Sequence, residues 1–407
     1  MRRRGVALSP RSPTSFAVRA LLLLACALPL TAPARATKNG AAGKAEAKGG
    51  SWFFAVSGDS RDCGDLVMPK IAWSIEHNRE AAPVEFYWHL GDLRAMFRID
   101  CDMIVRAHPD YDCRARPAAG LAPNDFNEYL MYAWDDFVER QIAPFGQTPF
   151  LLGIGNHELI NRTREDFRCR FSKWLTQEPI QSQLKADAKR GIPSQAASTF
   201  YHFVRGGVDF IYLDNADADA SFSDEQLDWL ARVLAADAED KKVRSIVVGM
   251  HAALPQSSER GHAMDATCRG FCTGLRAYDL LYRAQNLDAP PSRRKRVYVF
   301  ASHSHFFREN VYDTPEHRGR VLPGWIVGTA GAEQYTSRDT DPIRYGYLEV
   351  DVRPDGGLAP RFREVTRRTP PLMGGPGADA LTAFCFEQNK RAPADIHQTD
   401  CKCGPVP

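Results

Sequence analysis

Five short segments, spread over most of the chain, each place an Asp, Asn or His just after a run of strand-forming residues. The runs are 52–56, 86–90, 150–152, 245–248 and 297–300. The segments that follow them are Gly58-Asp59, Gly91-Asp92, Gly155-Asn156-His157-Glu158, Gly249-Met250-His251 and Ser302-His303-Ser304-His305. Ligands of open α/β sheets bind beyond the carboxyl ends of the strands, so we expect these side chains to gather at one edge. Oxygen and imidazole groups without cysteine suit a hydrolytic metal site.

The order of the five segments resembles that of the calcineurin-like metallophosphoesterases, a superfamily that includes the purple acid phosphatases. The resemblance covers roughly Trp52 to Val365, and it needs all five segments because a single Gly-Asp or Gly-Asn-His is common. It implies an α/β fold, a four-layer α/β/β/α sandwich with two mixed β-sheets. Predicted strands at 325–327, 345–352 and 360–365, which we assign to the far sheet, are compatible with it. It also implies hydrolysis of a phosphomonoester or phosphodiester through in-line attack by metal-bound hydroxide.

The resemblance further implies two divalent or trivalent metal ions, for which Zn, Mn, Fe or Co are candidates. One ion would be bound by a complete set of four ligands, Asp92, Asn156, His251 and His303. The other would be bound by Asp59, Asp92 and His305, so that Asp92 bridges the two ions. Two ions about 3.5–4 Å apart can activate a water, neutralise phosphoryl oxygens and stabilise the leaving oxygen.

His157 and Glu158 have other expected roles. In the family's Gly-Asn-His motif the His faces the phosphate, so His157 could donate a proton or a hydrogen bond to the leaving group. Glu158 would orient His157. The alternative makes Glu158 an acid at a helix start, near the positive end of the dipole, and both roles stay open.

The first segment departs from the family pattern. Many family members have Asp-x-His there and use that His as a ligand, while purple acid phosphatases use a Tyr three residues past the second Asp. Here the two positions are Arg61 and Ala95, so the set of Asp59, Asp92 and His305 is one ligand short. Without the Tyr we expect a colourless protein.

Three explanations of the missing ligand are open. A water or another side chain could fill the gap, for which His77, His89 and His108 are candidates, although His89 also suits a buried structural role. The ion could instead bind weakly.

The third explanation is that Arg61 supplies its own positive charge to the phosphate, with help from Arg94, because a guanidinium matches phosphate oxygens bidentately. The competing role for Arg61 is an ion pair with Asp62 or Asp65. Elsewhere, His262 could line the pocket.

The N-terminus has the pattern of a secretory signal peptide. Five arginines precede the apolar run Ala20 to Leu30, and Ala34-Arg35-Ala36 fits a cleavage site. The run is too short to span a membrane. We therefore expect a signal peptide at 1–36, cleavage after Ala36, and a secreted or periplasmic protein; a lipid anchor on Cys26 is the weaker alternative.

Charge argues against a nucleic-acid partner. The chain has 52 basic and 50 acidic residues, and residues 1–36 hold six arginines and no acidic residue. The mature chain would therefore have 46 basic and 50 acidic residues, a net charge of about −4. The sequence has no long basic tract that would recruit nucleic acid or anionic lipid. Arg293-Arg294-Lys295-Arg296 is a local exception, which we interpret as a solvated loop in preference to a binding patch.

Nine cysteines follow the signal peptide, and an exported chain with so many is expected to form disulfides. Cys268 with Cys272 is the first candidate pair, and Cys101 with Cys113 is the second. Nine is odd, which predicts one cysteine free or paired between chains. A zinc site at Cys401 and Cys403 is a weaker alternative.

The expected organisation is a flexible linker at 37–50, a catalytic domain at 51–366 and a Pro/Gly-rich tail at 367–407 that cysteines could hold to the body. An insertion at 94–148 should hold a helix at 127–142, which could shape a substrate mouth or serve packing. A hairpin is predicted at 199–204 and 208–213. A helix is predicted at 223–235 with a capping box of Ser223 and Gln226.

These patterns favour a metal-dependent phosphoesterase, with two alternatives. One is a degenerate relative that binds phosphate or another ligand with little turnover. The other is a surface interaction protein whose contacts come from the insertion and the tail. The sequence does not specify the substrate or the oligomeric state.

Overall fold

The computed structural model describes residues 50–78, 82–115, 123–259, 262–336, 338, 340–392 and 401–403. The expected signal peptide, Cys26 and nearly all of the expected linker lie outside these ranges. The helices are α1 (Gly64–His77), α2 (Cys101–Ala107), α3 (Pro123–Phe137), α4 (Arg164–Arg170), α5 (Ser172–Leu175), α6 (Ile180–Arg190), α7 (Asp224–Glu239), α8 (Cys268–Ala284) and α9 (Ala378–Ala383). The strands are β1 (Trp52–Ser57), β2 (Val84–His89), β3 (Phe150–Leu152), β4 (Tyr201–Arg205), β5 (Val208–Leu213), β6 (Ser245–Met250), β7 (Arg296–Ala301), β8 (Phe307–Glu309), β9 (Gly324–Val327), β10 (Gln334–Tyr335), β11 (Tyr345–Val352), β12 (Leu358–Val365) and β13 (Lys390–Arg391).

The strands form two large mixed sheets and one small one. The five-stranded sheet has the order β12-β11-β1-β2-β3, and the six-stranded sheet has the order β4-β5-β6-β7-β9-β8. Strands β1, β2 and β3 are parallel to one another, as are β5, β6, β7 and β9. The pairs β1–β11, β11–β12, β4–β5 and β8–β9 are antiparallel. Of the strands assigned from sequence to one far sheet, β9 lies in the six-stranded sheet, but β11 and β12 extend the sheet of β1. That assignment was wrong because strand propensity does not encode the pairing partner.

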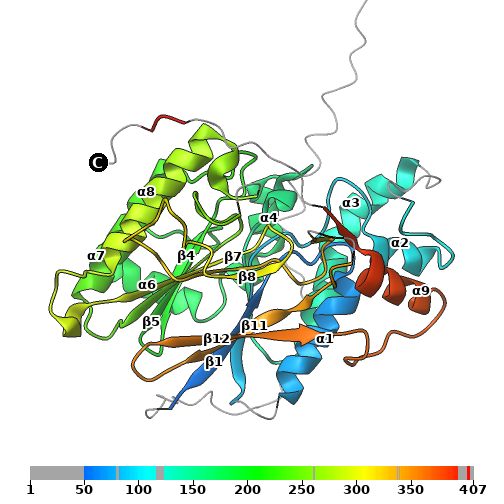
Figure 1. The fold of residues 1–407 in the computed structure, drawn as a ribbon, viewed down its shortest axis with the longest axis horizontal. Coiled ribbons are helices and arrows are strands. Elements are labelled where there is room, and N and C mark those ends of the chain that lie inside the picture. Colours follow the sequence, from blue (N-terminus) through cyan, green and yellow to red (C-terminus); the bar gives the residue numbers. More distant parts are fainter. Residues whose placement is uncertain are drawn as a thin grey trace, which may run out of the picture. The chain divides into compact units, whose positions relative to one another are not determined.

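Side-chain alternation divides the core into layers. On β6, Ile246 and Val248 belong to a cluster with α7 and α8, whereas Val247 belongs to the cluster shared with the five-stranded sheet. Such alternation is what a strand buried on both faces requires. Helix α1 packs on the other side, against β11 and β12. The result is the expected α/β/β/α sandwich of two mixed sheets between helices (Figure 1).

The predicted hairpin and helix are present with one correction. Strands β4 and β5 pair antiparallel around the turn that contains Gly206. Helix α7 begins after Ser223, whose Oγ accepts a hydrogen bond from the Gln226 amide at 3.1 Å. The expected capping box is incomplete, because the Gln226 side chain bonds the backbone N and O of Asp214 at 2.7 and 2.8 Å.

The insertion after β2 contains α2, α3 and the π-helical turn Val138–Ile142. Trp134 and Phe137 on α3 are buried against Phe171. Met131 and Tyr132 on its other face are 68% and 53% exposed. The insertion therefore has a packing face and a solvent face.

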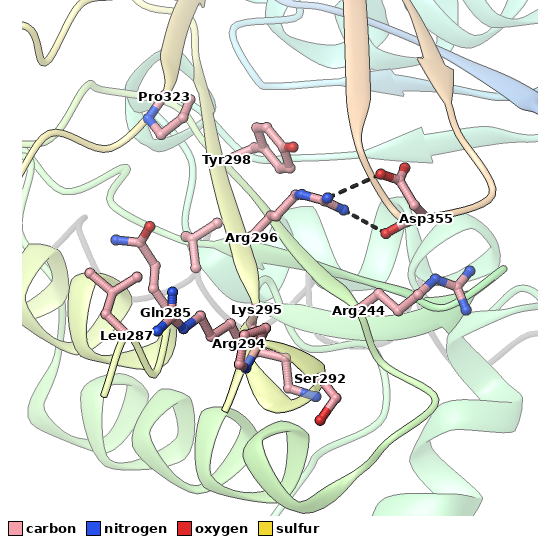
Figure 2. A pocket seen from close by; sticks show the side chains of 12 residues that line it. Arg244, Gln285, Leu287, Ser292, Arg294, Lys295, Arg296, Tyr298, Pro323 and Asp355 are labelled. Carbon is pink, nitrogen blue, oxygen red and sulfur yellow. Dashed lines mark hydrogen bonds and ion pairs between the residues drawn. The ribbon is translucent and has the colours of Figure 1, made fainter. Parts of the chain in front are cut away.

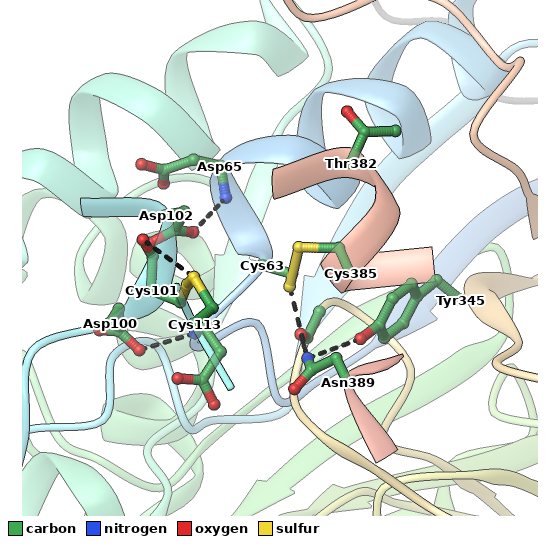
Figure 3. Close-up of a disulfide and its surroundings, with 12 residues drawn as sticks. Cys63, Asp65, Asp100, Cys101, Asp102, Cys113, Tyr345, Thr382, Cys385 and Asn389 are labelled. Carbon is green, nitrogen blue, oxygen red and sulfur yellow. Dashed lines mark hydrogen bonds between the residues drawn. A yellow bond between two sulfur atoms is a disulfide. The ribbon is translucent and has the colours of Figure 1, made fainter. Parts of the chain in front are cut away.

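The tail is held to the body by disulfides. Cys63, in the loop after β1, is bonded to Cys385, and Figure 3 shows this bond beside Asn389 and Tyr345. The expected Cys101–Cys113 disulfide is present. No cysteine of the described residues is free. Because nine cysteines follow residue 36, the expected odd cysteine of the mature chain, free or paired between chains, stays a prediction.

The expected Cys268–Cys272 pair is wrong. The residues between them form the first turn of α8, whose start is capped by Thr267 Oγ1. The two cysteines therefore lie side by side on one helix face, and they are bonded to Cys401 and Cys403 respectively. Four residues of helix rise about 6 Å, which is close to the spacing of alternate residues in an extended chain, about 6.6 Å. These bonds also exclude the Cys401 and Cys403 zinc site.

None of the helices within the described ranges is both long and apolar enough to cross a bilayer.

Candidate metal centre

The five motif segments form loops just past β1, β2, β3, β6 and β7, as expected. Asp59, Asp92 and His303 have left-handed backbone, with φ of 61°, 60° and 64°. Non-glycine residues rarely adopt this conformation, and it clusters at functional sites. A Cβ on Gly155 would lie 2.3 Å from Asp92 Oδ1. This position therefore needs glycine, so that the loop after β3 can approach the loop after β2.

The loops bring together a four-ligand group, which we define as Asp92, Asn156, His251 and His303. His251 Nε2 lies 3.2 Å from Asp92 Oδ1, 3.0 Å from Asn156 Oδ1 and 3.1 Å from His303 Nδ1. The donor atoms of Asp92, His251 and His303 all lie within 4.8 Å of one another. Their mixture of oxygen and imidazole nitrogen suits Zn, Mn or Fe.

A three-ligand group, which we define as Asp59, Asp92 and His305, shares Asp92 with the first. Its donor atoms also lie within 4.8 Å of one another, and all three side chains are buried. Asp59 Oδ1 and Asp92 Oδ2 accept no hydrogen bond from the described residues, although His305 Nε2 lies 3.3 Å from Asp59 Oδ1. Because an orphaned buried carboxylate oxygen is costly, these atoms fit a cation.

Backbone acceptors orient the histidine rings. His251 Nδ1 lies 3.0 Å from Leu90 O, and His305 Nδ1 lies 2.6 Å from Glu333 O. A ring whose Nδ1–H donates to a carbonyl presents an unprotonated Nε2, which is the ligating form. In both rings that Nε2 faces the carboxylates of the two groups.

The carboxylates of the centre hold their charge. Burial alone would raise the pKa of Asp92, but the nearby His157 and His251 outweigh it and hold the pKa well below its ordinary value. For Asp59, burial is likewise outweighed, mainly by His305, and the pKa is lowered. Both side chains are therefore available as charged ligands.

Arg61 occupies the space beside the three-ligand group. Its Nη2 lies 3.0 Å from His305 Nε2, and its Nη1 lies 2.6 Å from His157 Nε2. Arg61 is 8% exposed; burial opposes its charge, but acidic neighbours led by Asp92 raise its pKa overall. The competing ion pair is not formed, because Asp62 and Asp65 pair with other arginines.

His157 lies between Arg61 and the insertion. Its backbone N donates to Asp92 Oδ1 at 3.0 Å, and its Nδ1 lies 2.5 Å from Ala95 O. Burial, followed by the Arg61 charge, lowers the pKa of His157 to about 4. A neutral ring that donates from Nδ1 leaves Nε2 as an acceptor directed at the centre.

Glu158 does not contact the His157 side chain, so the expected orienting contact is absent. Its carboxylate accepts three backbone N–H bonds, from Asp92 at 2.9 Å, Leu93 at 2.9 Å and Gly155 at 2.8 Å. Burial and the Asp92 charge raise the pKa of Glu158 to about 8. Glu158 thus ties two motif loops together beneath the centre.

Arg94 lies outside the centre, contrary to the expectation that it would help Arg61. It is fully buried, and its guanidinium is held by Asp65 at 2.5 Å, by Asp102 at 3.0 Å and by Asp136. With three carboxylates around it, this cation is not available to a phosphate.

None of the histidines considered as replacement ligands reaches the centre. His77 on α1 bonds Trp73 O, and His108 is exposed after α2. His89 is buried in β2 and accepts from the Gly91 amide at 3.2 Å.

The sequence patterns missed Tyr335, which lies against the centre. Its ring stacks on His305 at 4.5 Å and on His262 at 4.8 Å between centroids, so His262 does lie near the centre. Arg391 from β13 lies 5.0 Å from the Tyr335 ring centroid. Tyr335 belongs to no motif, and strand β10 has only two residues, so no local signal marks it.

The chain matches no protein-family model and no curated protein. Among solved structures, it is similar to a purple acid phosphatase, PPD1, from yellow lupin (Lupinus luteus) seeds, with TM-score 0.49 and 13% identity over 78% of this chain. The match covers 52% of the lupin chain, so this chain spans about half of that protein's length. It is also similar to GAP50, the anchor in the inner membrane complex of Plasmodium, with TM-score 0.41, 12% identity, and coverage of 77% of this chain and 85% of that one.

Proposed function

We propose that the chain is an exported, metal-dependent phosphoric ester hydrolase of the calcineurin-like metallophosphoesterase superfamily, acting on phosphomonoesters or phosphodiesters. The main support is the convergence of all five motif loops on two ligand groups that share Asp92. The disulfides support export, because such bonds are typical of oxidising compartments.

In this reaction, the two ligand groups, Arg61 and His157 would each have a separate role. Ions in the two groups would lower the pKa of a water and neutralise phosphoryl oxygens. Arg61 would donate N–H groups to phosphate oxygens. His157 is held by Ala95 O, and its Nε2 faces the same space.

We further propose that the three-ligand group binds its ion more weakly than the four-ligand group. Arg61 Nη2 lies 3.0 Å from His305 Nε2, so an ion bound through that nitrogen must displace a guanidinium and then lie beside a positive charge. Among the described residues, no arginine or lysine is hydrogen-bonded to a histidine of the four-ligand group.

The test is metal content of residues 37–407, measured together with hydrolysis of para-nitrophenyl phosphate and its bis-ester. We expect one tightly held ion per chain, a second only at high metal concentration, and turnover that a chelator abolishes. Arg61→His supplies the imidazole of the Asp-x-His pattern, so it should raise the tightly bound ions from one to two. Arg98→His, at a partly exposed arginine paired with Asp62, is the control and should leave the number at one.

The alternative is a degenerate relative that binds phosphate or another ligand, or acts as a surface interaction protein. The observation that favours it is the guanidinium beside His305. Absence of bound ion and of turnover, even after Mn or Zn is added, would favour this alternative and contradict the proposal.

A further inference from the structure

A second pocket lies at the edge of the six-stranded sheet where β6 and β7 begin, opposite to the edge of the metal centre. Figure 2 shows its lining, and its volume is about 650 Å³. Arg244 precedes β6, Lys295 precedes β7, and Arg296 is the first residue of β7. The β11–β12 hairpin with Asp355 forms one wall. Pockets of about 300–1,000 Å³ are the usual size for small-molecule ligands.

The lining is strongly cationic. It contains the side chains of Arg244, Arg294, Lys295 and Arg296 and only one carboxylate, that of Asp355. Arg296 Nη2 pairs with Asp355 Oδ2 at 3.0 Å, which leaves three positive charges uncompensated within the lining. The mature chain is acidic overall, so this concentration of charge does not follow from the composition.

These cations retain hydrogen-bonding capacity. Arg244 donates from Nη2 to Gly206 O at 2.7 Å, while its Nε is buried and has no acceptor among the described residues. Arg294 is exposed and donates from Nε to Ala289 O at 3.0 Å. Lys295 is 5% exposed, and its Nζ donates to two backbone carbonyls at 2.6 and 2.8 Å. The Nζ of Lys295 is thus held by two carbonyls, and Arg294 is the exposed cation of the lining. The Arg244 guanidinium lies against Gly207 of the β4–β5 turn and points away from Arg294 (Figure 2).

Other lining residues are apolar. Leu287, Pro291, Pro323 and the ring of Tyr298 line the same pocket, and Leu287 is 45% exposed. A bare inorganic anion would leave these surfaces in water. A ligand with an anionic part and a flat organic part would cover both kinds of surface.

We propose that this pocket binds an organic anion with two adjacent phosphate groups, of the size and chemistry of a nucleoside diphosphate. Arg294 contacts the phosphates, the positive charges of Lys295 and Arg244 add attraction, and the organic part packs on Tyr298 and Leu287. The run 293–296 is then a binding element and not only a solvated loop. The proposal does not depend on the function proposed for the metal centre.

The test is calorimetric titration of ADP into residues 37–407 with chelator present, so that no ion in the metal centre contributes. We expect one ADP per chain, with affinity that falls as salt is raised. Arg294→Ala should weaken binding about tenfold, because a charge-assisted hydrogen bond contributes roughly that factor. Arg244→Ala/Arg294→Ala should weaken it further, pyrophosphate should bind less tightly than ADP, and adenosine should not bind measurably.

Two controls separate this pocket from general attraction and from the metal centre. Arg318 is exposed and outside the pocket, and Arg318→Ala should keep the wild-type affinity, as should Asn156→Ala in the four-ligand group. Melting curves check that each variant is folded. Lack of saturable ADP binding, equal loss in Arg318→Ala, or loss in Asn156→Ala with retention in Arg294→Ala would overturn the proposal.

Discussion

Asp92 is the side chain that the two ligand groups of the described residues have in common. It belongs to both ligand groups, its Oδ1 accepts from the His157 amide, and its own amide donates to Glu158. A single carboxylate that serves two ions makes the two sites interdependent. Replacement of Asp92 should therefore weaken ion binding at both sites, whereas loss of Asn156 should weaken it only in the four-ligand group.

Asp92→Asn should abolish the rise in melting temperature that Zn or Mn produces. The amide has no charge for either ion, and an ion present at 100 times its Kd stabilises a protein by about 2.7 kcal/mol. Asn156→Ala removes one ligand from one group and should keep part of the rise. An unchanged metal response in Asp92→Asn, measured by scanning calorimetry, would contradict the shared role.

His202, which belongs to none of the metal loops, is expected to have a large effect on the pH dependence of stability. It is buried between Asp187 Oδ2 at 3.0 Å and Asp209 Oδ2 at 2.8 Å. Burial opposes its charge, but Asp209 and Asp187 outweigh it and raise the pKa of His202 to about 10. Asp237 lies beside this group, and burial with the Asp209 charge raises the pKa of Asp237 to about 10 as well.

Both shifts give stability the same dependence on pH. The folded state binds protons that the unfolded state has lost, so stability is lost as pH rises toward about 10; for His202 this loss begins near pH 6.5. We therefore expect the free energy of unfolding, measured by denaturant at a series of pH values, to fall between pH 7 and 10.

His202→Gln should remove the part of this fall that comes from His202 and keep the part that comes from Asp237. It should also destabilise the protein at pH 7 by about 3–5 kcal/mol, because it leaves buried carboxylates without a cation. His317 is the matched control, since it is buried but bonded to a carbonyl, Pro255 O. Burial lowers the pKa of His317, so His317→Gln should keep the wild-type slope above pH 7. A slope in His202→Gln equal to that of the wild type would contradict the assignment.

The tail segment around η7 (Phe384–Gln388) and β13 links the C-terminal region to the metal centre. Cys385 is bonded to Cys63, which lies two residues after Arg61. Strand β13 pairs with β10 and places Arg391 over Tyr335, which stacks on His305. The segment thus reaches the three-ligand group indirectly, through Cys63 on the loop of Arg61 and through Tyr335 on His305.

Removal of the Cys63–Cys385 bond by Cys63→Ser/Cys385→Ser should cost about 5 kcal/mol, because the bond joins residues 322 apart. It should also weaken ion binding in the three-ligand group more than in the other. Cys101→Ser/Cys113→Ser opens a loop of separation 12 and should cost about 3 kcal/mol without changing ion binding. Equal effects of the two variants on the weaker ion, measured by calorimetric titration, would argue against a role of the tail in the centre.

Elements whose determinants are local were predictable from the sequence. The motif loops follow strands of matching propensity, Gly206 marks the turn between β4 and β5, and β11 occupies its predicted range. Features that depend on distant segments were not predictable, because no local pattern encodes them. Tyr335 needs β13 to complete its sheet, and Arg94 finds its carboxylates on three other elements.

Across the whole molecule, the two candidate sites lie at opposite edges of one sheet. The metal loops follow the carboxyl ends of β6 and β7, and the basic pocket lies at their amino ends. Because each central strand of a sandwich is packed on both faces, it is a rigid spacer between the two sites. Ligands at one edge are therefore separated from those at the other by the length of a strand.

The disulfides between the body and the tail also bear on how the protein is made. A chain leaves the ribosome in order, at about 5–20 residues per second. Cys63, Cys268 and Cys272 each have a partner at or beyond residue 385. Residues 1–384 are thus synthesised before any of these three bonds can close, and the waiting thiols are free to form wrong pairs, above all the neighbours on α8. Recovery from such pairs is slow, seconds to hours without help, so yield in a heterologous host should depend on a disulfide isomerase more than on codon usage or growth temperature.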